Sequence, residues 1–168
     1  MKKIVVLAFV LVILFGCEKD DICDANTPTT PRLVIEFYDN LTAVPTLKKV
    51  TNLGIISPGN ATGLGFNDVS KIYVPLKIDG VSTVFNFIQN GLTTVATDDN
   101  TDVVTFNYST KTIYVSRACG YKTNFSLNTT NGIVRADGAS NDGFWIQNIQ
   151  IVKSEIENEN DIHVKIFF

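Results

Sequence analysis

Short runs of alternating side chains constrain the fold of this chain more than any other feature. In the first run, residues 33–38, the side chains of Leu33, Ile35 and Phe37 share one face, which is the period-2 pattern of a half-buried strand. Similar runs occupy residues 49–56, 72–78, 84–89, 92–97, 103–108, 112–117, 121–127, 145–152 and 162–168. None of them sustains the 3.6-residue period of an amphipathic helix. The sequence therefore predicts an all-β fold.

Turn-forming dipeptides separate several of these runs and tolerate the positive φ angles of tight turns. They are Asp79-Gly80, Asn90-Gly91, Asn131-Gly132 and Asp142-Gly143. The first two predict consecutive hairpins over residues 72–97, and residues 109–111 are expected to join two further strands. Many short strands of this kind predict an antiparallel two-sheet β-sandwich, immunoglobulin-like, with about seven to nine strands.

Three positions refine this prediction. Pro75 lies inside the run 72–78, so that strand is expected at a sheet edge or at a bulge. The last run, with Val164 and Ile166 on its apolar face, continues to Phe168, so we expect the C-terminus to be part of a sheet. Residues 63–65 are interpreted as flexible or tightly turned backbone, because a phosphate loop would need a lysine at a defined spacing.

The N-terminus has the layout of an export signal. Lys2 and Lys3 precede an apolar run at residues 4–15, which is shorter than the about 20 residues of a membrane-spanning helix. Leu14-Phe15-Gly16-Cys17 resembles a lipobox, in which the cysteine receives a diacylglyceryl group and the leader is cut before it. The alternative is an uncleaved membrane anchor with an incidental cysteine.

This layout divides the chain into three parts: a signal peptide at 1–16, a lipidated tether and linker at 17–31, and a β-sandwich domain at 32–168. Acyl chains on Cys17 would hold the protein on a membrane. Lys19, Asp20 and Asp21 resemble the surface-export signal of Bacteroidetes lipoproteins, and a solvated charged tether is the alternative. We expect an outer membrane lipoprotein that faces the periplasm or the cell surface.

The composition excludes one class of partner. Cleavage before Cys17 leaves 152 residues, a length typical of one domain. It also removes two of the 14 basic side chains, so 12 face 17 acidic ones and the net charge is −5. Such a surface repels phosphate backbones, and nucleic acid is not an expected partner.

Lipidation of Cys17 leaves Cys23 and Cys119 as the remaining thiols in an oxidising compartment, where an even pair normally forms a disulfide. Two separate buried thiols are the alternative. A bridge would leave only residues 18–22 as free tether, about 17 Å long when fully extended. The domain would then lie close to the lipid surface.

The segment Tyr114-Val115-Ser116-Arg117-Ala118-Cys119-Gly120-Tyr121 resembles an uncharacterised lipoprotein family of the Bacteroidetes. The resemblance continues through residues 125–128, 149–152 and 162–166, and it includes the opening residues 17–23. Its most specific element is the Ala-Cys-Gly segment paired with the early Cys23, which supports the disulfide. The family is a domain of unknown function, so the resemblance implies no catalytic residue.

Candidate catalytic and metal-binding residues are few. The single histidine, His163, alternates with the apolar set of the last run, so we interpret it as solvent-facing or at an edge. Asp98, Asn100 and Asp102 have the spacing that begins a calcium loop, but Val103 and Ser109 occupy the positions of the required glycine and glutamate. An Asp/Asn-rich hairpin loop is the favoured interpretation, and neither a metal nor a cofactor is expected.

The acidic residues Asp137, Asp142, Glu155 and Glu157 are interpreted as solvated loop, although paired carboxylates can meet in space without a sequence signal. Tyr73, Phe144 and Trp145 are interpreted as core or partly covered edge aromatics. Phe144 and Trp145 are adjacent and face opposite ways, so the alternative is that one of them is exposed for a sugar or a partner. We therefore expect a non-catalytic binding or assembly module with an envelope protein or a glycan as partner. The alternative is a carbohydrate-active hydrolase.

Overall fold

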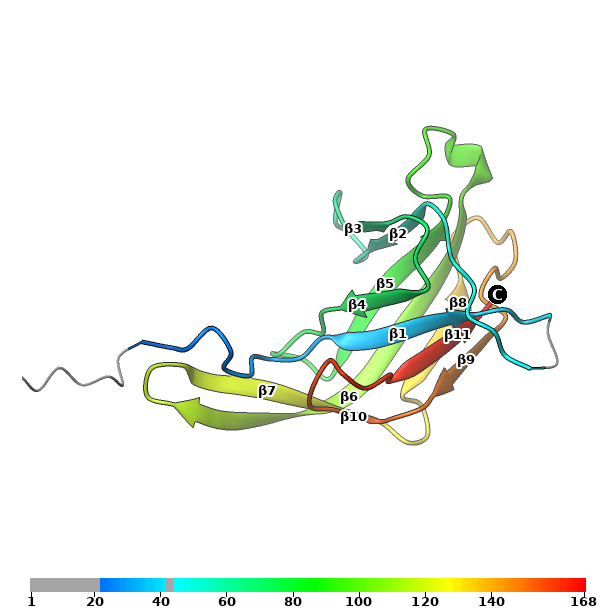
Figure 1. The fold of residues 1–168 in the computed structure, drawn as a ribbon. Coiled ribbons are helices and arrows are strands. Elements are labelled where there is room, and N and C mark those ends of the chain that lie inside the picture. Colours follow the sequence, from blue (N-terminus) through cyan, green and yellow to red (C-terminus); the bar gives the residue numbers. More distant parts are fainter. Residues whose placement is uncertain (1–21, 42–43) are drawn as a thin grey trace, which may run out of the picture.

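The computed structural model describes residues 22–41 and 44–168, and these residues form almost only β-structure (Figure 1). The elements are β1 Leu33–Tyr38, β2 Leu53–Ile56, β3 Leu64–Phe66, β4 Lys71–Val74, β5 Ser82–Gln89, the 3-10 helix η2 Ala96–Asp98, β6 Asn100–Ser116, β7 Gly120–Leu127, β8 Ile133–Asp137, β9 Asn148–Ile151, β10 Glu155–Ile156 and β11 Val164–Phe167. No helix among the described residues is long and apolar enough to cross a membrane. The leader at 1–16 and the sites at Cys17, Lys19, Asp20 and Asp21 lie outside the described residues.

Two sheets pack face to face. One has the order β4-β1-β11-β9, and the other has the order β10-β7-β6-β5-β2-β3 with β8 also paired to β6. All pairs among the described strands are antiparallel except β1 and β11, where Ile35 lies opposite Val164 in parallel register. The predicted all-β two-sheet sandwich is confirmed, with eleven described strands rather than seven to nine.

The core lies between the sheets and explains the alternation in the sequence. On β5, Phe85 and Phe87 face inward while their neighbours are only half-buried. Phe37 from β1 and Phe106 from β6 are completely buried on the facing sheets. Burial of a phenylalanine side chain contributes about 1.5 to 3 kcal/mol, so these strand faces supply much of the stability of the sandwich.

The predicted boundary at residues 109–111 is wrong. The runs 103–108 and 112–117 form one strand, β6, which extends for 17 residues. Lys111, the last residue of the expected turn, lies opposite Asn124 of β7 in regular antiparallel register. The chain reverses only after Ser116, where Gly120 has a φ of +69° that a glycine adopts without strain.

The consecutive hairpins predicted for residues 72–97 are also wrong. β4 pairs with β1 and belongs to the four-stranded sheet, whereas β5 belongs to the other sheet, so Asp79-Gly80 joins the two sheets. Residues 92–97 form no strand. Asn90 has a φ of +64° and ends β5, and Leu92 and Val95 then lie exposed in the loop that leads through η2 to β6.

Two predictions are confirmed: the strand before Pro75 lies at a sheet edge, and the C-terminal residues are part of a sheet. β4 is an edge strand and ends at Val74, directly before Pro75. β11 lies between β1 and β9, and the Phe168 amide donates to the Tyr38 carbonyl at 3.2 Å, so the last residues are part of a sheet. By contrast, β3, β8 and β10 lie where the sequence shows no clear alternating run, and β3 includes part of the segment 63–65 that was interpreted as turned backbone.

Candidate functional site

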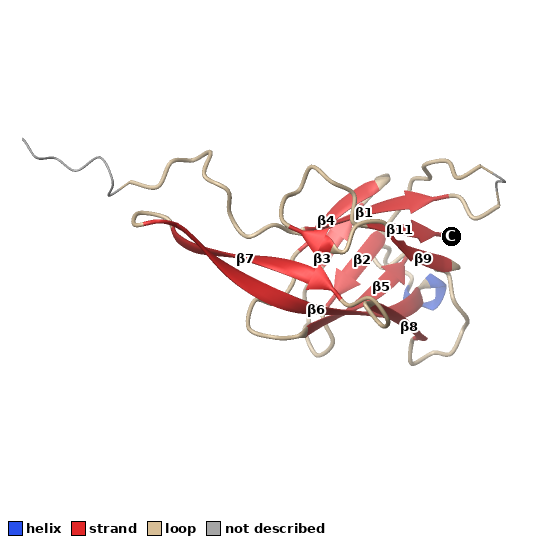
Figure 2. Cartoon of the chain, turned by 90° about the horizontal axis from the view of Figure 1, so that it is seen from below, coloured by secondary structure: helices blue, strands red, loops and turns tan. Residues whose placement is uncertain are grey.

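A two-stranded arm projects from the sandwich and is its most distinctive surface feature (Figures 1 and 2). We define the arm as residues 109–124, the outer part of β6 and β7 with the turn between them. β5 begins at Ser82, which lies opposite Asn107, so from Tyr108 onward β6 pairs only with β7 among the described strands. The N-terminal segment runs beside the arm, where Thr30 Oγ1 accepts a hydrogen bond from the Thr123 amide at 3.0 Å.

A disulfide joins the tip of the arm to the N-terminal segment. Cys23 and Cys119 are bonded with their Cα atoms 4.9 Å apart, although 96 positions separate them in the sequence. Ser116 Oγ accepts a hydrogen bond from the Cys119 amide at 3.0 Å, which orders the turn that carries the cysteine. The disulfide predicted from the sequence is confirmed, and the alternative of two free thiols is excluded.

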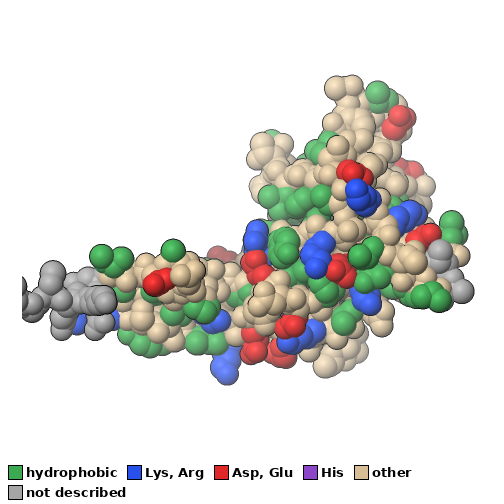
Figure 3. Space-filling view, viewed as in Figure 1, with side chains coloured by type: hydrophobic (Ala, Val, Ile, Leu, Met, Phe, Trp, Pro, Cys, Tyr) green, Lys and Arg blue, Asp and Glu red, His purple; other side chains and the backbone are tan. Residues whose placement is uncertain are grey.

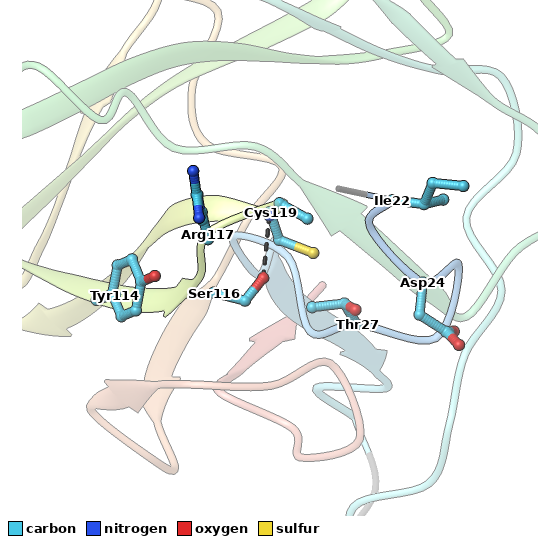
Figure 4. A pocket seen from close by; sticks show the side chains of 8 residues that line it. Ile22, Asp24, Thr27, Tyr114, Ser116, Arg117 and Cys119 are labelled. Carbon is cyan, nitrogen blue, oxygen red and sulfur yellow. Dashed lines mark hydrogen bonds between the residues drawn. The ribbon is translucent and has the colours of Figure 1, made fainter. Parts of the chain in front are cut away.

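A hollow of about 410 Å³ lies beside this disulfide (Figure 4). Its lining comes from two segments, with Ile22, Asp24 and Thr27 on one side and Tyr114, Ser116, Arg117, Ala118 and Cys119 on the other. The hollow is open to solvent and mixes polar with apolar groups. It therefore has the character of a surface contact rather than that of an enclosed ligand pocket.

Two exposed tyrosines face each other across the arm. Tyr114 on β6 lies opposite Tyr121 on β7, and their ring centroids are 5.4 Å apart in an edge-to-face arrangement. The side chains are 59% and 70% exposed. This pair was not predicted from the sequence, although a turn at Ala118-Cys119-Gly120 would place the two rings on neighbouring strands.

A buried carboxylate lies at the opposite end of β6. Asp102 is completely buried, and its Oδ2 accepts a hydrogen bond from the Ile146 amide at 2.7 Å. Burial raises the pKa of Asp102 to about 6. Its cross-strand neighbour Asp137 accepts a hydrogen bond from the Gly143 amide, so the two carboxylates hold the loop between β8 and β9.

The prediction that Asp98, Asn100 and Asp102 form a hairpin loop is therefore wrong in part. Only Asp98 lies in the loop before β6, whereas Asn100 and Asp102 belong to the strand itself. Asp102 faces inward because it alternates in register with Val104 on the covered face of β6. Among the described residues, no group of three or more His, Cys, Asp or Glu side chains could hold a metal ion.

His163 is buried, so its predicted solvent-facing position is wrong. It precedes the first residue of β11, and its Nδ1 accepts a hydrogen bond from the Val34 amide at 3.1 Å. The His163 amide in turn donates to the Val34 carbonyl, so two hydrogen bonds hold the residue against β1. Burial lowers the pKa of His163, so the neutral ring is favoured and supports the fold.

The other acidic candidates do not form one group. Asp137 lies beside Asp102, whereas Glu155 and Glu157 line a separate hollow of about 180 Å³ with Lys111 at the base of the arm. Glu155 belongs to β10, and its carboxylate accepts a hydrogen bond from Ser126 Oγ. The interpretation of these residues as loop is therefore wrong at Glu155 and at Asp137, which is the last residue of β8.

The adjacent aromatic residues Phe144 and Trp145 differ in burial, as expected for neighbours that face opposite ways. Trp145 is buried and its Nε1 donates to the Phe87 carbonyl at 2.9 Å, whereas Phe144 is 41% exposed and packs under the guanidinium of Arg135. Tyr73 is partly covered by Arg32, whose guanidinium lies 4.9 Å from the ring centroid. The interpretation of these residues as core or partly covered aromatics is confirmed.

Comparison with known proteins gives a family but no activity. The model of a family of unknown function, DUF6452, matches residues 52–168. Neither the curated proteins nor the solved structures contain a match to the chain.

Proposed function

Since the chain belongs to DUF6452, a family of unknown function, we propose its role from its own residues: it is a lipid-anchored protein of the bacterial cell envelope. Its sandwich acts as a non-catalytic module for binding or assembly. The anchor is a diacylglyceryl group on Cys17, after cleavage of a leader at residues 1–16. The membrane in this proposal is the outer membrane, with the sandwich on its periplasmic or its outer side.

The observation that carries the proposal is the disulfide between Cys23 and Cys119. Disulfides persist in oxidising compartments and are rare in the cytosol, so this bond supports a location outside the cytoplasm. The same location is needed for acylation at the lipobox that ends in Cys17. Two independent features of the chain, one covalent bond and one processing motif, therefore favour the same compartment.

A binding or assembly role fits the chemistry of the buried and exposed groups. The imidazole of His163 is enclosed in the sandwich and its Nδ1 is used in a backbone hydrogen bond. The accessible features are instead the tyrosine pair and the open hollow at the arm. Exposed aromatic rings are typical of contact surfaces, since they combine a large apolar area with a polar tip.

The anchor is tested by intact mass spectrometry of the protein purified from membranes. We expect a chain that starts at Cys17 and carries acyl chains, and a Cys17→Ser variant that retains its leader and takes up no labelled fatty acid. Cys119→Ser is the matched control, because it removes a cysteine but leaves acylation intact. An unmodified thiol at Cys17 with the leader still attached would overturn the proposal.

The partner is tested by crosslinking in cells followed by purification of the tagged lipoprotein. Recovery of one stoichiometric envelope protein would support an assembly role, and recovery of glycan alone would support sugar binding. Recovery of neither, under conditions that capture a known envelope complex, would argue against a binding module.

A second candidate function is a carbohydrate-active hydrolase. It is favoured by Glu155 and Glu157, which line one hollow and are the type of residue that such enzymes use in pairs. Glu155→Gln and Glu157→Gln would each abolish hydrolysis of an oligosaccharide panel by the lipoprotein. Wild-type protein that hydrolyses no member of the panel would exclude this candidate.

A further inference from the structure

The arm presents an aromatic and basic surface at the point where the N-terminal segment meets it. We infer that the tip of the arm, with Tyr114 and Tyr121, lies on the lipid headgroups of the membrane to which the chain is anchored. The inference rests on the proposed lipidation for its setting and names the surface that contacts the bilayer. Its occupant is an anionic phospholipid surface.

The N-terminal segment of the described chain lies at the tip of the arm. Ile22 and Asp24 line the hollow at the arm tip, and the disulfide of Cys23 keeps them there. Five residues, 18–22, separate that cysteine from Cys17, and they span at most about 17 Å. An acyl group on Cys17 would therefore hold the tip of the arm, rather than the far end of the sandwich, near the headgroups.

The charge of the arm supports the same inference. From Tyr108 to Leu127 the sequence has three basic residues, Lys111, Arg117 and Lys122, and no acidic residue, in a mature chain whose net charge is −5. Asp24 is the acidic side chain at the tip hollow. Figure 3 shows hydrophobic and basic side chains along the projecting arm, while acidic side chains are more frequent on the body. This distribution complements anionic headgroups.

The tyrosine pair supports the inference as well. Tyrosine is enriched at membrane interfaces, where the ring contacts the acyl boundary and the hydroxyl stays among the headgroups. Tyr114 and Tyr121 are exposed side by side on the same face of the ribbon. Lys111 and Lys122 lie on the opposite face, where Lys122 Nζ donates to the Glu157 carbonyl at 3.5 Å and Lys111 lines a hollow with Glu155 and Glu157. They act on anionic lipid through the charge they add to the arm, and the tyrosines make the direct contact.

The experiment places a fluorescent probe at the arm and a matched probe at the other end of the molecule. The mature chain 17–168 with Cys17→Ser is exported under a cleavable leader and anchored by an N-terminal histidine tag to nickel-chelating vesicles. The vesicles contain phosphatidylglycerol and phospholipids brominated on the acyl chains. One variant carries Tyr121→Trp, and the control carries Leu41→Trp, which replaces an exposed residue in the loop after β1. The buried Trp145 gives a constant background in both variants.

We expect the brominated lipid to quench Tyr121→Trp fluorescence several times more strongly than Leu41→Trp fluorescence. Adding Lys111→Gln and Lys122→Gln should reduce this difference to that seen with phosphatidylcholine vesicles. Equal quenching of the two probes would overturn the inference and leave the arm as a surface for a protein partner. Because the tag replaces the acyl group, this result is independent of whether Cys17 is lipidated, and circular dichroism confirms that each variant is folded.

Discussion

The two halves of β6 have the same conformation but different surroundings. Residues 100–107 lie between β5 and β8 and bury every second side chain, including Val104 and Phe106. Residues 109–116 continue the same strand, but the face that buries Val104 and Phe106 there carries Thr110 and Thr112, which are exposed. The change occurs after Tyr108, where the pairing with β5 stops and β6 enters the arm. Burial along this strand therefore stops where the pairing with β5 stops, and the side chains on that face change from apolar to polar at the same point.

The two halves are also stabilised differently. The inner half packs aromatic rings against each other, with the centroids of Phe87 and Phe106 6.4 Å apart. The outer half has only β7 as a strand partner among the described strands. The Cys23–Cys119 disulfide and the hydrogen bond from the Thr123 amide to Thr30 link the arm to the N-terminal segment. A two-stranded ribbon alone is marginally stable in water, so the covalent bond is the expected support of the arm. Four measurements test this contrast.

The largest effect is expected for Phe106→Ala in the inner half. The side chain is completely buried, so its removal leaves a cavity that the facing sheet cannot fill. The free energy of unfolding should fall by about 3 to 5 kcal/mol in urea denaturation. A loss below about 1 kcal/mol would show that the inner half is no better packed than the arm.

The next effect is expected for the double substitution Cys23→Ser and Cys119→Ser. Loss of this disulfide should lower the free energy of unfolding by about 2 to 4 kcal/mol, because the unfolded chain regains the freedom of a loop of 96 positions. Hydrogen exchange should become faster at Lys111 to Thr123 and remain slow at residues 102–107. Unchanged protection of the arm would show that strand pairing alone maintains it.

The third effect is a pH dependence at Asp102 in the inner half. Burial raises its pKa from 3.8 to about 6, so the protonated acid is favoured in the folded state and stability falls as the pH rises through this range. Between pH 5 and pH 8 the wild type should lose about 1.4 kcal/mol relative to Asp102→Asn. Comparing the two proteins cancels the opposite contribution of His163, whose pKa is lowered. If the difference between the urea midpoints of the two proteins were the same at pH 5 and at pH 8, the burial of Asp102 would be contradicted.

The smallest effect is expected for Thr112→Ala in the outer half. The side chain is exposed and lies opposite Thr123, so its truncation removes little buried surface. The free energy of unfolding should change by no more than about 0.5 kcal/mol. A cost similar to that of Phe106→Ala would reveal that a further part of the protein covers the arm.

Much of the fold could be predicted from residues that act locally. The first strand has the predicted bounds 33–38, and the edge position of the strand before Pro75 follows from the missing amide of proline. The disulfide followed from counting thiols in an oxidising compartment. These predictions succeed because each depends on backbone chemistry or on covalent bonding, which are the same in every packing arrangement of the chain.

The wrong predictions concern residues whose state depends on distant segments. His163 was expected at the surface, but Val34, 129 positions earlier, supplies the hydrogen bond that holds it inside. Glu155 was expected in a loop, but Ser126 lies opposite it and makes it a strand residue. The candidate site was missed for the same reason, because the exposure of Tyr114 and Tyr121 depends on where the opposing sheet ends.

The sequence by itself determined that the chain forms β-strands, which residues alternate along them, and that Cys23 and Cys119 are available to each other. Only the tertiary structure decided that one strand continues through Lys111, that Asp102 and His163 lie inside, and that the arm stands free of the second sheet. The physical reason is that periodicity and bonding capacity are properties of neighbouring residues, whereas burial is a relation between surfaces that meet only after folding.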